Sequence, residues 1–120
     1  MSNSSKTIYY FSLYLFPLSL LLLLVPNFLL KAFMLPPTDE VWIRVVGMLV
    51  FFLGVIYFNA ARLELHSLYK VFAYNRIGVL VFFIVFVAIG WSPWPLILFG
   101  VIDAAAGLWT LSALKKEGKF

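Results

Sequence analysis

Asp103 has the most unusual setting of any residue in this chain of 120 residues. It lies between Gly100 and Gly107, near the middle of a long apolar run that holds no other charge. An ionised carboxylate at such a depth in a membrane costs at least ~2.5–3.5 kcal/mol, so Asp103 should face neighbouring helices and have a partner. Such a carboxylate fixes helix register through an ion pair, or it takes up a proton, a cation or a ligand.

Two arginines are candidate partners for this carboxylate. Arg76 and Arg44 each lie near the end of an apolar run, and they would approach Asp103 from opposite faces of the membrane. Either guanidinium would donate charge-assisted hydrogen bonds to the carboxylate. A third interpretation is a neutral Asp103 that is hydrogen-bonded to the backbone or to Tyr57, Asn59 or Thr110.

The remaining reactive residue types indicate no catalytic or metal site. The chain has one histidine, His66, and no cysteine. No paired carboxylates, catalytic triad, phosphate-binding loop or histidine-rich metal motif is present. We therefore expect no enzyme, no catalytic residue, no metal and no cofactor, and we interpret His66 as a solvated loop residue.

The elements that position these residues are predicted to be membrane helices. Hydrophobic residues make up 64% of the chain and charged residues only 12%, whereas soluble domains carry about 25% charged residues. A membrane-crossing helix needs about 20 mostly apolar residues. Four segments qualify, at about 8–30, 42–61, 71–90 and 95–114. The sequence predicts one all-α domain over 1–120, a polytopic membrane protein with four transmembrane helices in an antiparallel up-down bundle.

The helix ends are less regular than the spans themselves. We expect Pro17 to kink the first helix. The second helix is expected to continue past Arg62 into water, with a turn near His66 and Ser67. Aromatic residues at the expected membrane interfaces are Tyr9, Tyr10, Trp42, Tyr69, Trp91 and Trp94.

Small residues mark two helix faces that could pack closely. They are Gly47, Gly54 and Ala61 in the second segment, and Gly100, Ala104 and Gly107 in the fourth. Small side chains let membrane helices approach each other. The simplest arrangement packs the second segment against the fourth, within one chain or between two copies, with Arg44 and Asp103 at the seam.

The distribution of cations predicts the orientation of the chain in its membrane. Four spans place both termini and the middle connection on one side. Of the nine Lys and Arg residues, only Lys31 and Arg44 lie on the other side, which leaves seven, namely Lys6, Arg62, Lys70, Arg76, Lys115, Lys116 and Lys119. Lys and Arg gather on the cytoplasmic side of membranes, so both termini are predicted to be cytoplasmic.

Three stretches carry a family resemblance. They are residues 42–47 (Trp-Ile-Arg-Val-Val-Gly), 76–78 (Arg-Ile-Gly) and 103–110 (Asp-Ala-Ala-Ala-Gly-Leu-Trp-Thr). Together they make the region from Trp42 to Leu114 resemble small, four-span, DoxX-like bacterial inner-membrane proteins. That resemblance implies four spans and carries no catalytic residue onto this chain. The length is also similar to that of small multidrug-resistance transporters, but the membrane-embedded Glu of their first span has no counterpart in 8–30.

These observations favour a non-enzymatic integral protein of a bacterial inner membrane. It would act as an accessory, scaffold or small-ligand-binding component, in contact with the lipid bilayer and with either a membrane-protein partner or further copies of itself. No basic cluster is interleaved with stacking aromatics, so no nucleic acid is expected. The alternative is a small proton- or cation-coupled transporter or channel that uses Asp103.

Overall fold

The computed structural model describes residues 1–120, which form five α-helices and no strand. The helices are α1 (Asn3–Leu24), α2 (Pro26–Ala32), α3 (Trp42–Arg62), α4 (His66–Ala88) and α5 (Leu96–Lys116). All except the short α2 are long and apolar enough to cross a membrane. The prediction of an all-α fold with four spans is confirmed, and the chain is a multi-pass membrane protein.

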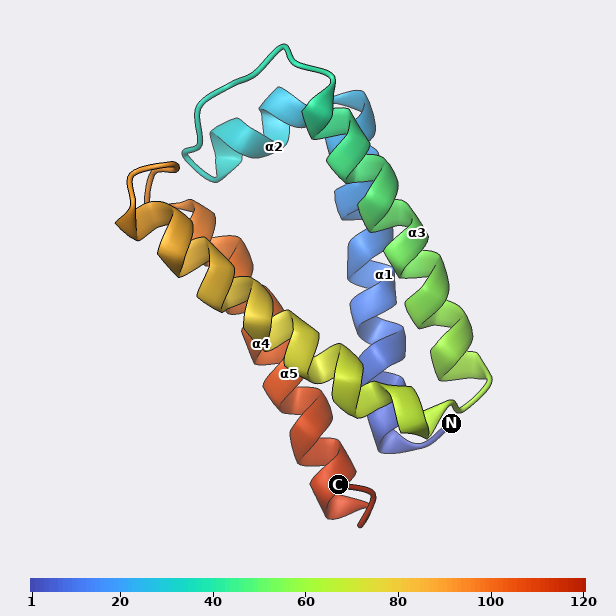
Figure 1. The fold of residues 1–120 in the computed structure, drawn as a ribbon. Coiled ribbons are helices and arrows are strands. Elements are labelled where there is room, and N and C mark those ends of the chain that lie inside the picture. Colours follow the sequence, from blue (N-terminus) through green and yellow to red (C-terminus); the bar gives the residue numbers. More distant parts are fainter.

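The four long helices are arranged as two antiparallel helix pairs. One pair is α1 with α3, and the other is α4 with α5. The two pairs meet at the end of the molecule that holds both termini and the turn between α3 and α4 (Figure 1). Towards the opposite end they diverge, and α2 with the loop that follows it lies across the wide end. The bundle is therefore wedge-shaped, with a narrow end and a wide end.

The hydrophobic core lies at the narrow end. Its buried cluster draws side chains from all four long helices: Ile8, Phe11, Leu15, Tyr57, Ala60, Ala61, Tyr69 and Leu114. Residues on α1 that face this core recur at spacings of three and four, as expected for one buried face of a helix. Because the core is confined to this end, the wide end has no comparable packing between the two pairs.

The small-residue faces pack within the helix pairs rather than between them. A Cβ added to Gly47 would lie 2.9 Å from the Cβ of Leu22 on α1. A Cβ added to Gly107 would lie 2.7 Å from the carbonyl oxygen of Ala73 on α4. The predicted packing of the second span on the fourth is therefore wrong. Small residues identify a face of close approach, but they do not specify which helix will fill it.

A third small-residue face, on α1, was not predicted from the sequence. Ser5, Ser12 and Ser19 recur every seven residues, and all three are fully buried. Ser12 and Ser19 donate their hydroxyls to carbonyl oxygens one turn earlier, of Tyr9 and Phe16. Because the hydroxyls of Ser12 and Ser19 are satisfied within α1, these two serines act as small packing residues, equivalent to the glycines of α3.

Several predicted helix boundaries differ from the structure. The first and third spans begin earlier, at Asn3 and His66, and α3 ends at Arg62 instead of continuing past it. The first span is divided at Val25, because Pro26 has no backbone N–H and instead begins α2; α1 itself continues through Pro17. The predicted turn near His66 and Ser67 is wrong. The chain turns at residues 63–65, where Glu64 adopts a positive φ of 54°, and His66 already begins α4.

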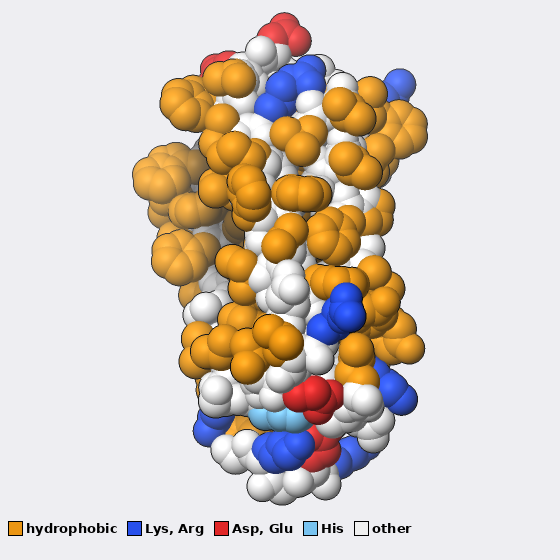
Figure 2. All heavy atoms as spheres, turned by 90° about the vertical axis from the view of Figure 1, so that its right-hand side faces the viewer, with side chains coloured by type: hydrophobic (Ala, Val, Ile, Leu, Met, Phe, Trp, Pro, Cys, Tyr) orange, Lys and Arg blue, Asp and Glu red, His pale blue; other side chains and the backbone are white.

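The outer surface has the distribution expected for a protein in a bilayer. On the face formed largely by α3, hydrophobic side chains cover the middle of the molecule, and most charged side chains lie towards its two ends (Figure 2). Large apolar residues are well exposed on this belt, including Leu49, Phe52 and Phe82. Contact of this surface with lipid removes it from water and needs no protein partner.

Candidate ligand cavity

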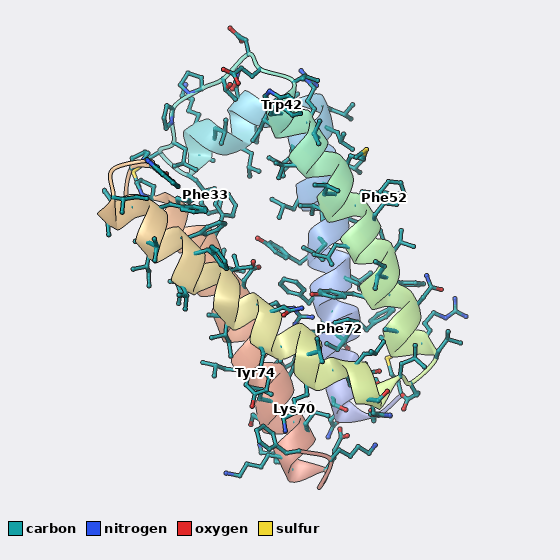
Figure 3. All side chains as sticks on the ribbon, viewed as in Figure 1. Phe33, Trp42, Phe52, Lys70, Phe72 and Tyr74 are labelled. Atoms are coloured by element: carbon teal, nitrogen blue, oxygen red, sulfur yellow. The ribbon has the colours of Figure 1, made fainter.

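A partly open cavity of about 350 Å³ lies between the two helix pairs. Seventeen of its twenty lining residues are hydrophobic, and the other three are Asn75, Arg76 and Asp103. Figure 3 shows side chains of both pairs projecting towards this space, with Phe72 near the narrow end and Phe33 near the wide end. The volume lies within the range of sites that bind small molecules.

Each long helix contributes one face to the cavity wall. On α3 the lining residues are Ile43, Val46, Val50, Leu53 and Tyr57, which recur every three or four positions. This spacing places all five on one side of the helix. The opposite side of α3 carries exposed residues such as Met48 and Phe52. A membrane helix that is hydrophobic all round therefore has one face towards lipid and one towards the cavity.

The wide end of the cavity is closed by α2 and by an aromatic pair. The rings of Phe33, directly after α2, and Phe99, on α5, are stacked with centroids 4.0 Å apart. Leu29 and Leu30 of α2 also line the cavity. The break at Pro26 makes this possible, because it redirects the chain across the bundle instead of extending α1.

Arg76 forms part of the wall near the narrow end. Its side chain is only 3% exposed, although it carries a full charge. The guanidinium carbon lies 4.1 Å from the ring centroid of Phe11 on α1 and 4.5 Å from that of Tyr57 on α3. None of its three side-chain nitrogens has a hydrogen-bond partner. Arg76 thus crosses from one helix pair to the other, held by aromatic rings and not by an acid.

Asp103 lies on the wall of the same cavity but does not pair with Arg76 or with Arg44. The only ion pairs join His66 to Glu64 and Lys119 to Glu117. The predicted guanidinium–carboxylate ion pair is therefore wrong. Its absence follows from the register of α5 on α4. Gly107 packs beside Ala73 and Ile77, and Gly100 beside Leu80 and Phe83. Asp103 is then level with Val79, about one helical turn from Arg76 towards the wide end.

Two other predicted partners of Asp103 lie outside the cavity. Arg44 is exposed and donates a hydrogen bond to the carbonyl oxygen of Leu23. Asn59 is also exposed and donates to the carbonyl oxygen of Val55, within its own helix. Of the partners predicted for Asp103, Arg76 and Tyr57 line the same cavity. Thr110, a proposed partner of Asp103, instead bonds to Thr7 at the narrow end, with 2.7 Å between the hydroxyl oxygens.

Phe11 is the cavity residue that sequence reasoning missed. It was one of thirteen phenylalanines, and nothing in its position distinguished it from those that face lipid. Only the packing of α1 against α4 shows that its ring covers the guanidinium of Arg76. An aromatic partner for a membrane-embedded arginine has no fixed spacing in the sequence, so the sequence could not predict this contact.

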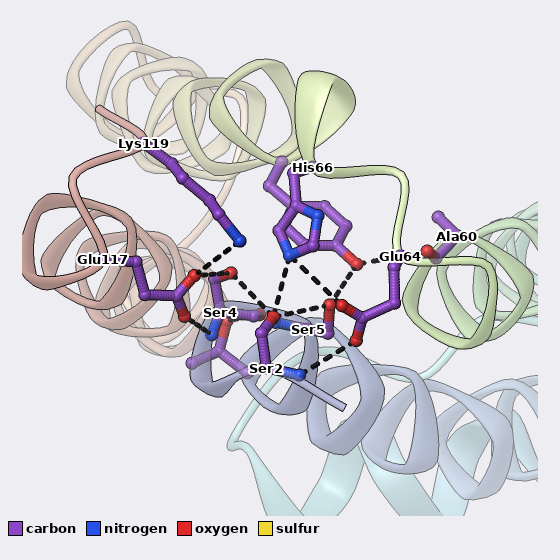
Figure 4. A network of polar contacts seen from close by, with 10 residues as sticks. Ser2, Ser4, Ser5, Ala60, Glu64, His66, Glu117 and Lys119 are labelled. Carbon is purple, nitrogen blue, oxygen red and sulfur yellow. Dashed lines mark hydrogen bonds and ion pairs between the residues drawn. The ribbon is translucent and has the colours of Figure 1, made fainter.

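The narrow end is closed by a polar network at the start of α1 (Figure 4). His66 Nε2 lies 2.8 Å from the Ser2 hydroxyl and 3.4 Å from the Glu64 carboxylate. The Tyr69 hydroxyl lies 2.6 Å from that of Ser5 and donates to the carbonyl oxygen of Ala60. The interpretation of His66 as a solvated loop residue is wrong, and so is that of Tyr69 as an interface residue, because Tyr69 is fully buried.

Two glutamates accept hydrogen bonds from backbone N–H groups at the beginning of α1, which have no acceptor within the helix. The Ser2 N–H donates to Glu64, and the Ser4 N–H and hydroxyl donate to Glu117 at 2.6 and 2.8 Å. The hydrogen bond from the Ser2 backbone lowers the pKa of Glu64. Burial raises the pKa of Glu117, but the hydrogen bonds from Ser4 and the charge of Lys119 outweigh it, so its pKa is also lowered. These contacts attach α1 to both the α3–α4 turn and the end of α5.

The fold and cavity define a multi-pass helical membrane protein with a partly open, mostly apolar cavity that contains a buried guanidinium and a carboxylate. No three metal-ligating side chains of the His, Cys, Asp and Glu types lie together in this structure. Comparisons with protein-family models, curated proteins and solved structures give no match. The proposals below therefore depend on the cavity itself.

Proposed function

We propose that this chain is a non-enzymatic, ligand-binding component of a bacterial inner membrane, and that it holds a small, largely apolar molecule between its two helix pairs. One observation carries the proposal: a buried guanidinium without any hydrogen-bond partner lies on the wall of an otherwise apolar cavity of about 350 Å³. A buried donor that lacks an acceptor is strongly destabilising, so such a group is expected to meet its acceptor in a bound molecule.

The shape of the cavity supports a bound molecule more than a scaffold role. A scaffold needs tight packing between its helices, and here the two pairs are packed tightly only at the narrow end. At the wide end they are held apart by α2 and by the Phe33–Phe99 pair, which leaves an apolar chamber. Empty apolar space of this size loses dispersion contacts throughout its lining, and a ligand would restore them.

The orientation proposed for the chain has both termini in the cytoplasm. The narrow end carries Lys6, Arg62, Lys70, Lys115, Lys116 and Lys119, whereas the wide end carries Lys31 and Arg44. Arg76, which sequence reasoning assigned to the cytoplasmic set, lies within the membrane part of α4 and does not count towards either side. Six cations against two still support cytoplasmic termini. The resemblance of Trp42–Leu114 to DoxX-like proteins supports a bacterial inner membrane.

Saturable photolabelling tests the binding function. The purified chain in a non-ionic detergent would be irradiated with a long-chain alcohol that carries a diazirine, with and without excess unlabelled hexadecanol. Val79 lines the cavity, whereas Val81, on the same helix, is 57% exposed towards lipid. We expect Val79→Trp to abolish the saturable labelling and Val81→Trp to leave it intact. Equal saturable labelling in the two variants, or none in the native chain, would refute the proposal.

A second candidate function is a proton- or cation-coupled transporter. The observation that favours it is that Asp103 faces the cavity without an ion-pair partner, as a carboxylate that accepts a proton or cation would do. It is weaker than the first because one end of the cavity is closed by the core and the other by α2.

A further inference from the structure

We propose that the ligand is a single-chain amphiphile with a carboxylate head, and that Arg76 binds this head while Asp103 restricts it to one negative charge. This inference rests on the proposed binding function and names the class of ligand.

The guanidinium of Arg76 has donors that no protein atom accepts. The rings of Phe11 and Tyr57 lie 4.1 and 4.5 Å from its central carbon, and their own centroids are 5.9 Å apart, so the rings lie on adjacent sides of the guanidinium. A guanidinium carries its N–H donors in its plane, and the ring carbons give these donors no oxygen acceptor. Nε, Nη1 and Nη2 are all buried and unpartnered. Arg76 therefore has aromatic contacts for its charge but no acceptor for its hydrogen-bond donors.

A carboxylate is the acceptor that these donors bind best. The parallel N–H groups of a guanidinium match the two oxygens of a carboxylate, and such bidentate bonds are stronger than bonds to neutral acceptors. A negative charge also compensates the buried positive charge of Arg76, which no side chain does within 4 Å. A neutral head, such as an alcohol, would satisfy a donor without compensating the charge.

The rest of the cavity is long and mostly apolar. From Phe11 to Leu22 on α1, the lining residues extend over eleven positions, or roughly 16 Å along the helix axis. Over this length the wall is mainly leucine, valine and phenylalanine, with Tyr14 as a polar residue and Asp103 as the one charge beyond Arg76. An extended hydrocarbon chain fits a narrow apolar chamber of this kind, with its head at Arg76 and its tail directed to Leu29 and Leu30 of α2.

Asp103 limits the charge that the head of the ligand can carry. Asp103 lies about one helical turn from Arg76, on the same cavity wall. Its carboxylate opposes a second negative charge beside Arg76, since like charges repel strongly where water is excluded. A carboxylate head carries one charge, whereas a phosphate monoester carries close to two at neutral pH. Asp103 therefore disfavours the phosphate monoester.

Competition for the photolabelled site tests this assignment in the native chain. Hexadecanoic acid, hexadecanol and hexadecyl phosphate share one tail length and differ only in the head. We expect the acid to compete about tenfold better than the alcohol, the gain of one charge-assisted bond, and also better than the phosphate. If the alcohol competes as well as the acid, and Val79→Trp still removes the labelling, the cavity binds apolar molecules but the carboxylate assignment is wrong.

Three variants then assign the two charges. Arg76→Met should reduce competition by the acid to that of the alcohol, and the matched control Arg62→Met, at an exposed arginine stacked on Phe58, should not. Asp103→Asn removes the repulsion, so it should improve competition by hexadecyl phosphate about tenfold or more. A folded Arg76→Met protein that keeps the preference for acid would overturn the role of Arg76. Unchanged discrimination against phosphate in Asp103→Asn would overturn that of Asp103.

Discussion

The guanidinium carbon of Arg76 lies 4.1 Å from the ring centroid of Phe11, and this contact joins the two helix pairs at the narrow end of the cavity. Arg76 comes from α4, whereas Phe11 comes from α1. Cation–π contacts gain strength when they are shielded from water, and this one is almost fully buried. The same arginine therefore closes the narrow end and presents its free N–H groups to the cavity.

Replacing Arg76 distinguishes a ligand-binding role from a purely structural one. Because its charge has no partner, Arg76→Met should leave the stability of the delipidated protein unchanged or raise it by up to about 2 kcal/mol. Phe11→Ala, which removes a core ring that is 6% exposed, should lower stability by about 3–5 kcal/mol. Thermal unfolding in detergent measures both. If Arg76→Met lowers the melting temperature as much as Phe11→Ala does, the arginine is a structural clamp.

The close contact of α4 with α5 depends on Gly107. A Cβ at this position would lie 2.7 Å from the carbonyl oxygen of Ala73, which belongs to the backbone and cannot rotate away. We expect Gly107→Ala to destabilise the protein by about 1–3 kcal/mol. Gly78→Ala is the matched control, because no atom lies within 4 Å of its added Cβ; it should be neutral or slightly stabilising, as alanine favours helix. Equal melting temperatures for the two variants would contradict the observed helix contact.

The network at the narrow end should make the stability of the protein depend on pH in the acid range. Glu64 and Glu117 have pKa values lowered from 4.5 in the folded protein, so the unfolded chain binds protons more readily. Their contribution to stability is therefore complete above pH 4.5 and is lost as the pH falls through the lowered values. Melting temperatures measured from pH 7 to pH 3 should decrease in this range. Glu117→Gln should lower the melting temperature at pH 7 and converge with the native protein at pH 3; a constant difference would exclude this linkage.

Proton flux separates the two candidate functions. Native protein in liposomes that contain a pH-sensitive dye should show no flux beyond that of protein-free liposomes, since the two ends of its cavity are closed. Asp103→Asn should behave in the same way while altering ligand discrimination. A flux in the native protein that Asp103→Asn abolishes, with the bundle still folded, would instead establish the transporter.

Single cysteines report the orientation directly, because the chain has none of its own. Asp39→Cys places a thiol in the loop at the wide end, and Lys119→Cys places one beyond α5 at the narrow end. With cytoplasmic termini, a membrane-impermeant maleimide should label Asp39→Cys in intact spheroplasts and Lys119→Cys only after lysis. The reverse pattern would invert the proposed orientation.

Local composition was sufficient to predict the spans. The apolar runs around Gly54, Val81 and Asp103 appear as α3, α4 and α5, with ends displaced by a few residues. Hydropathy works here because each membrane helix satisfies its own backbone hydrogen bonds, so its existence depends on its own residues. The larger errors came at Pro26 and Glu64, where a proline and a positive φ decide the direction of the chain.

Which helices pack against each other depended on contacts between residues that are distant in the sequence. Gly47 and Gly107 mark faces of close approach in the sequence, yet both faces packed on helices other than those expected. Arg76 and Asp103 are charges that sequence reasoning joined in a pair, whereas the register of α5 on α4 keeps them a turn apart and aromatic rings cover the arginine. Lipid is as apolar as the helix surfaces, so burial alone does not select a partner, and shape complementarity between whole faces does. That complementarity exists only once the helices have been brought together.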